Sequence, residues 1–162
     1  MKIASLTQSN NYFEDFQPGD LIRHARGKTI ESLDNVMFSN LVMNTSQGHF
    51  NEHFSAAMPP PFGQRLVFGG LTFALVVGLA SQDTSENALA EVSVERISFK
   101  SPVKHGDTIY AYSEVLSVSD APDRSDGGLV RFRHWGVNER DQVVCEAERT
   151  VLIKRRAHWG DR

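Results

Sequence analysis

The chain has 162 residues, of which 40% are hydrophobic and 23% charged, and this composition is typical of a folded domain. Its net charge of −3 provides no basic field for a nucleic-acid backbone, so we expect no nucleic-acid partner. We interpret residues 1–162 as a single domain. The N-terminus lacks an apolar run of signal-peptide length, and the single cysteine, Cys145, excludes an internal disulfide. We therefore expect a cytoplasmic protein.

The first third of the chain is predicted to hold one strand and one amphipathic helix. Residues 17–20 read Gln-Pro-Gly-Asp, a turn signal, and residues 21–29 can form a strand after it. Residues 32–43 are predicted to form a helix with Ser32 as its N-cap, because their apolar members lie near one stripe. That stripe consists of Leu33, Val36, Leu41 and Met43.

Residues 70–81 are predicted to form a helix that is apolar nearly all round, which indicates burial on most sides. The uncharged stretch that contains it, residues 66–82, is slightly short for a membrane span and includes three glycines. We therefore interpret this stretch as a core helix and expect no membrane partner.

The second half of the chain is predicted to be a run of antiparallel strands. Apolar and polar residues alternate over 92–99, with a phase slip at Glu95 that indicates a bulge. Residues 108–118 form the next expected strand, and residues 129–137 and 142–153 are expected to pair as a hairpin. One buried helix followed by long strands predicts an α+β fold in which a curled antiparallel sheet wraps around the helix. Its strand edges predict a homodimer or a dimer of dimers.

A histidine with polar neighbours precedes the apolar helix. His49 can accept and return a proton near neutral pH. The start of the helix presents unpaired N–H groups, of which we expect Gly69 to polarise a carbonyl oxygen and Gly70 to contact the substrate. This combination predicts proton chemistry beside an acyl carbonyl, although His49 taken alone could be an ordinary loop histidine.

The same histidine belongs to an H-x-x-E-H pattern, formed by His49, Glu52 and His53. In zinc proteases that pattern needs a helix with both histidines on one face and a distant third ligand. Because turn-forming residues surround it here, we expect no metal.

Three motifs resemble the MaoC-like dehydratases of the hot-dog fold, a family that includes R-specific enoyl-CoA hydratases. The acidic aromatic opening that ends in Pro-Gly-Asp is similar to residues 12–20, and the family's helix start corresponds to residues 68–72. The family's Pro-Val motif before the long strand stands unchanged at residues 102–108. The match covers residues 12–154. It implies a hot-dog fold and an acyl-CoA hydratase or dehydratase, a hydro-lyase whose CoA thioester is substrate and which needs no cofactor.

The resemblance implies that His49 is the catalytic histidine, but the family's aspartate position holds Asn44 and its asparagine position holds Ser46. An amide can orient water but cannot accept its proton. Either His49 performs both proton transfers, or another carboxylate such as Glu52 or Asp34 assists, or the protein is weakly active. Hydrogen bonds to the substrate or within the loop are expected from Ser46 and Gln47.

A narrower resemblance, carried by Asn44, Gln47 and residues 62–67, is to the mesaconyl-CoA or itaconyl-CoA hydratase branch. It implies a short branched or dicarboxylic acyl-CoA, such as mesaconyl-CoA or methylmalyl-CoA, with Arg65 as a fork for the second carboxylate. Arg65 could equally be a surface residue. The alternatives are a straight-chain R-specific enoyl-CoA hydratase, a hot-dog thioesterase, and a non-catalytic hot-dog protein that binds acyl-CoA.

Overall fold

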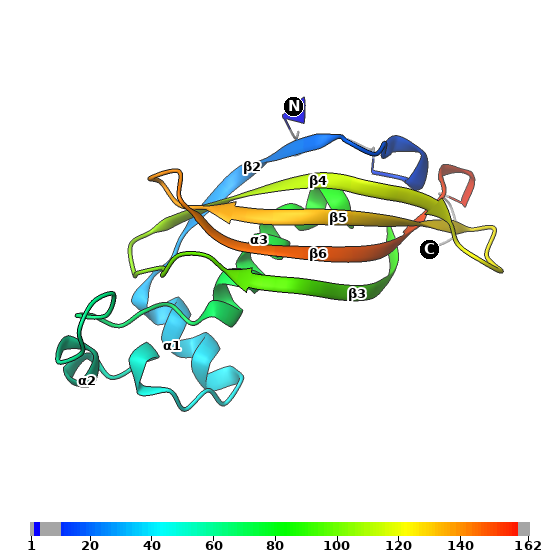
Figure 1. Ribbon diagram of the computed structural model, residues 1–162. Helices are drawn as coiled ribbons and strands as arrows, with labels where there is room; N and C mark the ends of the chain where they lie inside the picture. Colours follow the sequence, from blue (N-terminus) through cyan, green and yellow to red (C-terminus); the bar gives the residue numbers. More distant parts are fainter. Residues whose placement is uncertain (1, 4–10, 159–162) are drawn as a thin grey trace.

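The computed structural model describes residues 2–3 and 11–158. Its strands form one sheet in the order β1-β2-β4-β5-β6-β3, which curls around helix α3 (Figure 1). The strands are β1 (Lys2–Ile3), β2 (Leu21–Thr29), β3 (Ala88–Phe99), β4 (Thr108–Asp120), β5 (Gly127–Val137) and β6 (Val143–Lys154). The helices are α1 (Ser32–Leu41), α2 (Glu52–Ala56) and α3 (Gly69–Thr84), with short 3-10 turns η1 (Phe13–Asp15), η2 (Gln47–His49) and η3 (Arg156–His158).

Strands β4, β5 and β6 form the predicted antiparallel meander, and the expected hairpin pairs Val137 with Val143. The meander stops there, because β3 pairs with β6 and β2 pairs with β4. The strands on either side of the meander therefore both come from earlier in the chain. The expected bulge is confirmed: the β3–β6 register shifts between Glu95 and Ser98, and Arg96 has a φ of 53°. The short parallel strand β1 was not predicted.

Helix α3 lies against the concave face of the sheet and is longer at both ends than predicted (Figure 1). A glycine in β5 permits the close approach, because a Cβ at Gly136 would lie 2.5 Å from Val76 Cγ2. The prediction of burial on most sides is wrong for one face, where Ala74 and Gly78 are exposed. A sheet can cover only one side of a helix, so the opposite side of α3 remains open in the single chain. Among the described residues no helix is long and apolar enough to cross a membrane.

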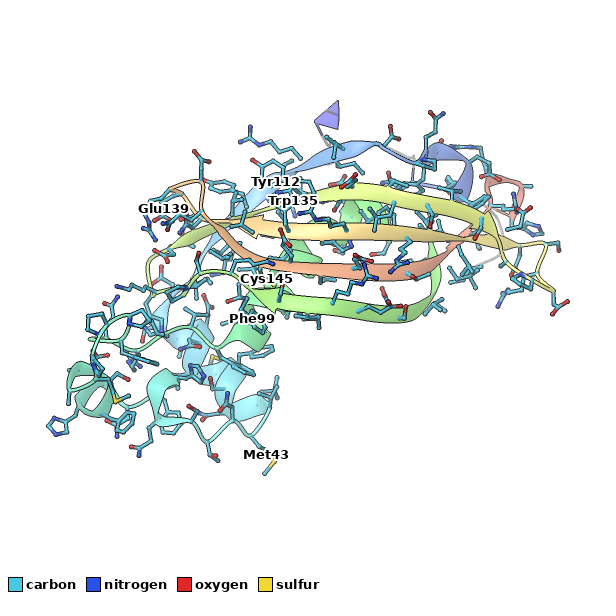
Figure 2. All side chains as sticks on the ribbon, viewed as in Figure 1. Met43, Phe99, Tyr112, Trp135, Glu139 and Cys145 are labelled. Carbon is cyan, nitrogen blue, oxygen red and sulfur yellow. The ribbon has the colours of Figure 1, made fainter. Side chains whose placement is uncertain are left out.

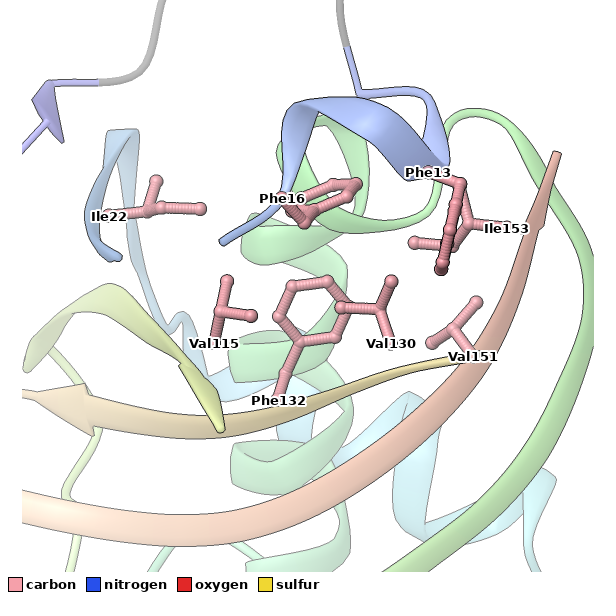
Figure 3. Packing of buried hydrophobic residues seen from close by; sticks show 8 residues of the cluster. All are labelled: Phe13, Phe16, Ile22, Val115, Val130, Phe132, Val151 and Ile153. Carbon is pink, nitrogen blue, oxygen red and sulfur yellow. The ribbon is translucent and has the colours of Figure 1, made fainter. Parts of the chain in front are cut away.

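The core is divided into two apolar clusters. One packs η1 against the middle of the sheet, and in it the Phe16 and Phe132 rings meet edge to face at 5.2 Å (Figure 3). The other packs the first half of α3 against β4 and β6 and includes Val76, Ile109 and Cys145. Burial raises the pKa of the Cys145 thiol to about 11, as expected for a small buried hydrophobe.

Helix α1 differs most from its prediction. Glu31 is the N-cap residue, and its backbone N–H donates to the Asp34 carboxylate at 2.9 Å, so Ser32 is the first helical residue. The helix ends at Leu41, and Met43 follows with a φ of 57°. The apolar stripe does not form the buried face, since Leu41 is 80% exposed. Asn35 and Ser39 are buried instead, because that side of α1 faces polar backbone at the start of α3.

Candidate active site

A cleft of about 480 Å³ opens between η2, the start of α3 and the end of β3. The elements that form it lie together at one end of the sheet, where α1 and α2 also project (Figure 1). The cleft therefore brings together η2 and the end of β3, which lie about fifty residues apart in the sequence, beside the start of α3. Its lining comprises Ser46, Gly48, His49, Phe62, Leu66, Val67, Gly69, Thr72, Phe99, Lys100, Ser101, Pro102, Val103 and Val144.

His49 is half-buried, and its position is set by a hydrogen bond with a backbone carbonyl. Its Nδ1 lies 3.0 Å from the Leu66 oxygen. A carbonyl can only accept, so Nδ1 carries the hydrogen, and the neutral ring has its lone pair on Nε2. The ring also packs against Phe68 at a centroid distance of 5.3 Å. His49 therefore brings a ring with an oriented lone pair to the cleft, and its catalytic role stays a prediction.

The start of α3 brings a backbone donor to the same cleft, because Gly69 is in its lining, whereas Gly70, which was predicted to contact the substrate, is not. Phe68 is the N-cap residue, and its carbonyl accepts from Leu71 and Thr72. The N–H groups of Gly69 and Gly70 are at the first two helical positions, which have no intrahelical acceptor. They sit at the positive end of a sixteen-residue helix and can bind an oxyanion.

Gly69 is also held tightly by a residue from β3. A Cβ at this position would lie 3.0 Å from the Phe99 ring, whose position beside the start of α3 is visible in Figure 2. A Cβ at Gly70 would meet the Phe68 ring at 2.5 Å. A side chain at Gly70 would therefore displace the Phe68 ring, and one at Gly69 would press against Phe99. Phe99 contributes to an apolar wall of the cleft that was not predicted.

The loop before His49 folds on itself. The Asn44 amide oxygen accepts from the Ser46 backbone N–H at 2.9 Å, which is an Asx turn. Asn44 does not line the cleft, whereas Ser46 does. The Gln47 side-chain oxygen accepts from Asn51 at 2.6 Å, so Gln47 stabilises the start of α2. Of these three predicted site residues, the structure brings only Ser46 to the cleft with His49.

Arg65 is engaged within the protein. Its Nε donates to Glu52 at 2.7 Å and its Nη2 donates to the Ser32 hydroxyl at 2.9 Å. It does not line the cleft. Its role as a fork for a substrate carboxylate stays a prediction, and the geometry favours a supporting role for Arg65 behind the site.

Among the described residues, those that line the cleft include no carboxylate. Glu52 is paired with Arg65, and Asp34 accepts from Lys28 at 2.8 Å and from Glu31 N–H. Those contacts lower the pKa of the Asp34 carboxyl, with the Lys28 hydrogen bond as the main cause. Neither of the two carboxylates considered as helpers therefore reaches the cleft.

The H-x-x-E-H residues do not share a helix. His49 ends η2, whereas Glu52 and His53 belong to the five-residue helix α2. Within residues 2–3 and 11–158, no group of three His, Cys, Asp or Glu side chains is placed to hold a metal ion. The pattern therefore lacks the shared helix that the zinc-protease motif needs.

Two residues behind the cleft were missed, the buried Asn35 and the half-buried His105. Asn35 donates to the His49 carbonyl, and His105 Nε2 accepts from Asn35 at 3.0 Å. The sequence offered one signal for Asn35, because asparagine favours caps and turns and is unusual in the interior of a predicted helix.

Comparisons with known proteins agree with this geometry. A protein described as having a double hotdog fold, from Mycobacterium tuberculosis, superimposes with a TM-score of 0.78 at 23% identity over 91% of this chain and 45% of that chain. The beta-methylmalyl-CoA dehydratase of Chloroflexus aurantiacus is 32% identical over 91% of this chain and 46% of that protein. The (R)-specific enoyl-CoA hydratase of Rhodospirillum rubrum is 30% identical over 90% of this chain and 94% of that protein.

The curled sheet around one helix is the hot-dog fold, which confirms the predicted α+β class. The model of the mesaconyl-CoA hydratase family matches residues 3–155, and the chain belongs to that family. The resemblance to hot-dog hydratases is thereby confirmed. The chain spans about half the length of the Chloroflexus relative.

Proposed function

We propose that the protein is a hydro-lyase that adds water reversibly to the double bond of an enoyl-CoA thioester. The observation that carries the proposal is the placement of the His49 ring and the Gly69 N–H group on one cleft. A base with its lone pair on Nε2 and an oxyanion donor are the groups that this reaction requires. No metal or other cofactor takes part.

In the proposed reaction, His49 Nε2 removes a proton from water while the water oxygen bonds to Cβ. The electrons of the double bond move to the thioester oxygen, and the Gly69 N–H group stabilises that enolate. The imidazolium then returns the proton to Cα, which leaves His49 neutral. Hydrogen and hydroxyl have then been added across the double bond. His49 performs both transfers, because the carboxylates that could share them are engaged elsewhere.

The proposed substrate is a short branched or dicarboxylic acyl-CoA such as mesaconyl-CoA. Membership of the mesaconyl-CoA hydratase family supports it. Lys100 also supports it, because it is the cationic residue of the cleft lining, with its Nζ 3.4 Å from Glu146. The second carboxylate of a dicarboxylic acyl group is costly to desolvate unless a cation such as the Lys100 ammonium group pairs with it. Lys100 replaces Arg65 as the group that pairs with this carboxylate.

A second candidate is a straight-chain R-specific enoyl-CoA hydratase. The apolar lining favours it, since Phe62, Phe99 and Val103 face the cleft and Arg65 does not. The similarity to the Rhodospirillum rubrum hydratase points the same way.

Incubation with mesaconyl-CoA and, separately, crotonyl-CoA tests these functions. We expect loss of enoyl absorbance with both, and a preference for mesaconyl-CoA of about ten- to a hundredfold in kcat/KM. A preference for crotonyl-CoA would select the straight-chain hydratase. Release of free thiol would indicate a thioesterase, and binding without turnover would indicate a non-catalytic acyl-CoA-binding protein.

A second hot-dog unit is part of the proposal, in a homodimer or a dimer of dimers. Strand β3 is a sheet edge, and the apolar residues Val92, Val94 and Ile97 are exposed along it. Such an edge is a template for strand pairing. Sedimentation at micromolar concentration is expected to show a dimer or larger, and a monomer would contradict this. A cytoplasmic location fits the buried thiol of Cys145.

A further inference from the structure

Asn35 is fully buried in α1 and contacts the histidine loop and the residues just before α3. Its Nδ2 carries two hydrogens and lies within hydrogen-bond distance of three acceptors, so two of the acceptors share one hydrogen. These acceptors are the His49 carbonyl oxygen at 2.9 Å, the Leu66 carbonyl oxygen at 3.1 Å and His105 Nε2 at 3.0 Å. Its Oδ1 accepts from the Phe68 backbone N–H at 2.9 Å. The Asn35 side chain therefore links the histidine loop to Phe68, the N-cap residue of α3.

The Leu66 carbonyl is shared. It accepts from the Asn35 amide and from His49 Nδ1, which is the bond that places the lone pair of His49 on Nε2. Phe68 immediately precedes Gly69, so the bond to Phe68 N–H also fixes where the helix begins. The Asn35 amide thus holds the Leu66 carbonyl, which orients His49, and the Phe68 peptide, which precedes Gly69.

We propose that Asn35 is a positioning residue that holds the His49 imidazole and the Gly69 N–H group at their working separation. The expected effect of Asn35 on turnover rests on the proposed hydratase function, whereas its expected effect on the orientation of His49 does not. A misplacement of about 1 Å can cost about a hundredfold in rate. Asn35 touches no reacting atom and acts through the Leu66 carbonyl and Phe68.

A ring of neighbours keeps Asn35 in place. His105 must be neutral at Nε2 to accept from the amide, and burial, with the Arg65 charge as a second cause, lowers its pKa. Arg65 is in turn held by Glu52 and Ser32. Burial and the Arg65 charge thus favour the neutral His105 that Asn35 requires, whereas the Glu52 charge acts in the opposite direction.

Asn35→Asp and Asn35→Ala test the proposal. Aspartate keeps the volume and can still accept from Phe68, but it cannot donate to the Leu66 carbonyl. Ser39→Ala is the matched control, because Ser39 is buried one turn further along α1 and its hydroxyl has no hydrogen-bond partner among the described residues. Thermal unfolding establishes that each variant is folded.

The first readout is the nitrogen NMR spectrum of the His49 ring, which needs no substrate. We expect the Nδ1–H tautomer in wild type and Ser39→Ala, and a mixture of tautomers in both Asn35 variants. The second readout is turnover of an enoyl-CoA, where we expect kcat to fall about a hundredfold in Asn35→Ala with KM little changed.

Unchanged tautomers in the folded Asn35 variants, or a loss of kcat no larger than in Ser39→Ala, would overturn the proposal. The Nε2–H tautomer in wild type would overturn it even if neither Asn35 variant folds. If wild type turns over no enoyl-CoA, the proposed function fails, while the spectrum still decides whether Asn35 positions His49.

Discussion

A histidine lies at each end of α3, and the two histidines differ in their access to solvent. At its start, His49 and Gly69 line a cleft. At its end, Asp83 lies 2.7 Å from His24 Nδ1, and His24 Nε2 lies 2.7 Å from the Ser113 hydroxyl. That order of carboxylate, imidazole and hydroxyl is the order of a hydrolase triad. Ser113 is fully buried, however, and no substrate can reach it.

The cluster at the end of α3 continues deeper into the sheet. The Ser113 hydroxyl lies 2.7 Å from His134 Nδ1, and His134 Nε2 has no partner among the described residues. Arg149 is buried nearby and pairs with Glu91. These contacts tie the helix to β2, β4 and β5, so the cluster stabilises the fold. The comparison teaches that access to solvent, rather than the types of residue present, distinguishes the candidate active site.

The largest expected effect is on activity at the start of α3. His49→Ala should lower the hydration rate by about 10²–10⁴-fold, because it removes the acid/base group. Ser113→Ala should leave the rate per folded molecule unchanged and lower only stability. Loss of enoyl absorbance measures the first, and urea unfolding measures the second. Full activity in His49→Ala would place the chemistry elsewhere and undo the contrast between the two clusters.

The cluster at the end of α3 should instead control stability in acid. Burial, with the charges of Arg149 and His24 as further causes, lowers the pKa of His134 from 6.5 to about 3. Between these values the unfolded chain binds a proton that the folded chain does not. The free energy of unfolding should therefore fall as the pH drops below about 6.5, by about 1.4 kcal/mol per pH unit.

Urea unfolding of wild type and His134→Phe at pH 7.5 and pH 5 measures this contribution. Phenylalanine preserves the ring but does not titrate, so the variant should lose less stability between the two pH values. Equal losses in the two proteins would show that His134 does not carry the acid sensitivity.

Substrate preference should respond to Lys100 and not to Arg65. Lys100→Met should reduce the preference for mesaconyl-CoA over crotonyl-CoA by about tenfold, which is the worth of one charge-assisted contact. Arg65→Met should lower kcat/KM for both substrates equally, because Arg65 supports His105 from behind the cleft. A selective loss of mesaconyl-CoA turnover in Arg65→Met would restore the original prediction of an arginine fork.

The smallest effect is expected for Asn44→Asp. The carboxylate can accept from Ser46 N–H as the amide does, so the Asx turn should persist. Asn44 lies off the cleft, and turnover should therefore stay near that of wild type, with a gain if the carboxylate reaches water. A strong loss in steady-state kinetics would show that the Asn44 amide has a role of its own.

Local patterns predicted most of the elements. Strand β2 has the predicted bounds, and the bulge in β3 and the β5–β6 hairpin were both expected. Alternation of apolar residues suffices for β5 and β6, because alternate residues of these strands face the core. The apolar residues of β3 alternate as well, although they are exposed in the single chain. The same argument failed for α1, whose apolar stripe is exposed. Its buried face is defined by hydrogen bonds to a segment about thirty residues away.

The sequence by itself determined the fold class, and its local motifs pointed to His49 as the proposed base and to Gly69 as the proposed oxyanion donor. Only the tertiary structure decided which side chains share the cleft with them. Arg65 and Asn44 lie outside the cleft, whereas Phe99, at the end of β3, and the following Lys100 line it. Asn35 lies behind His49 and contacts its backbone carbonyl. The physical reason is that the neighbours of a site are set by the pairing of distant segments, which no local periodicity encodes.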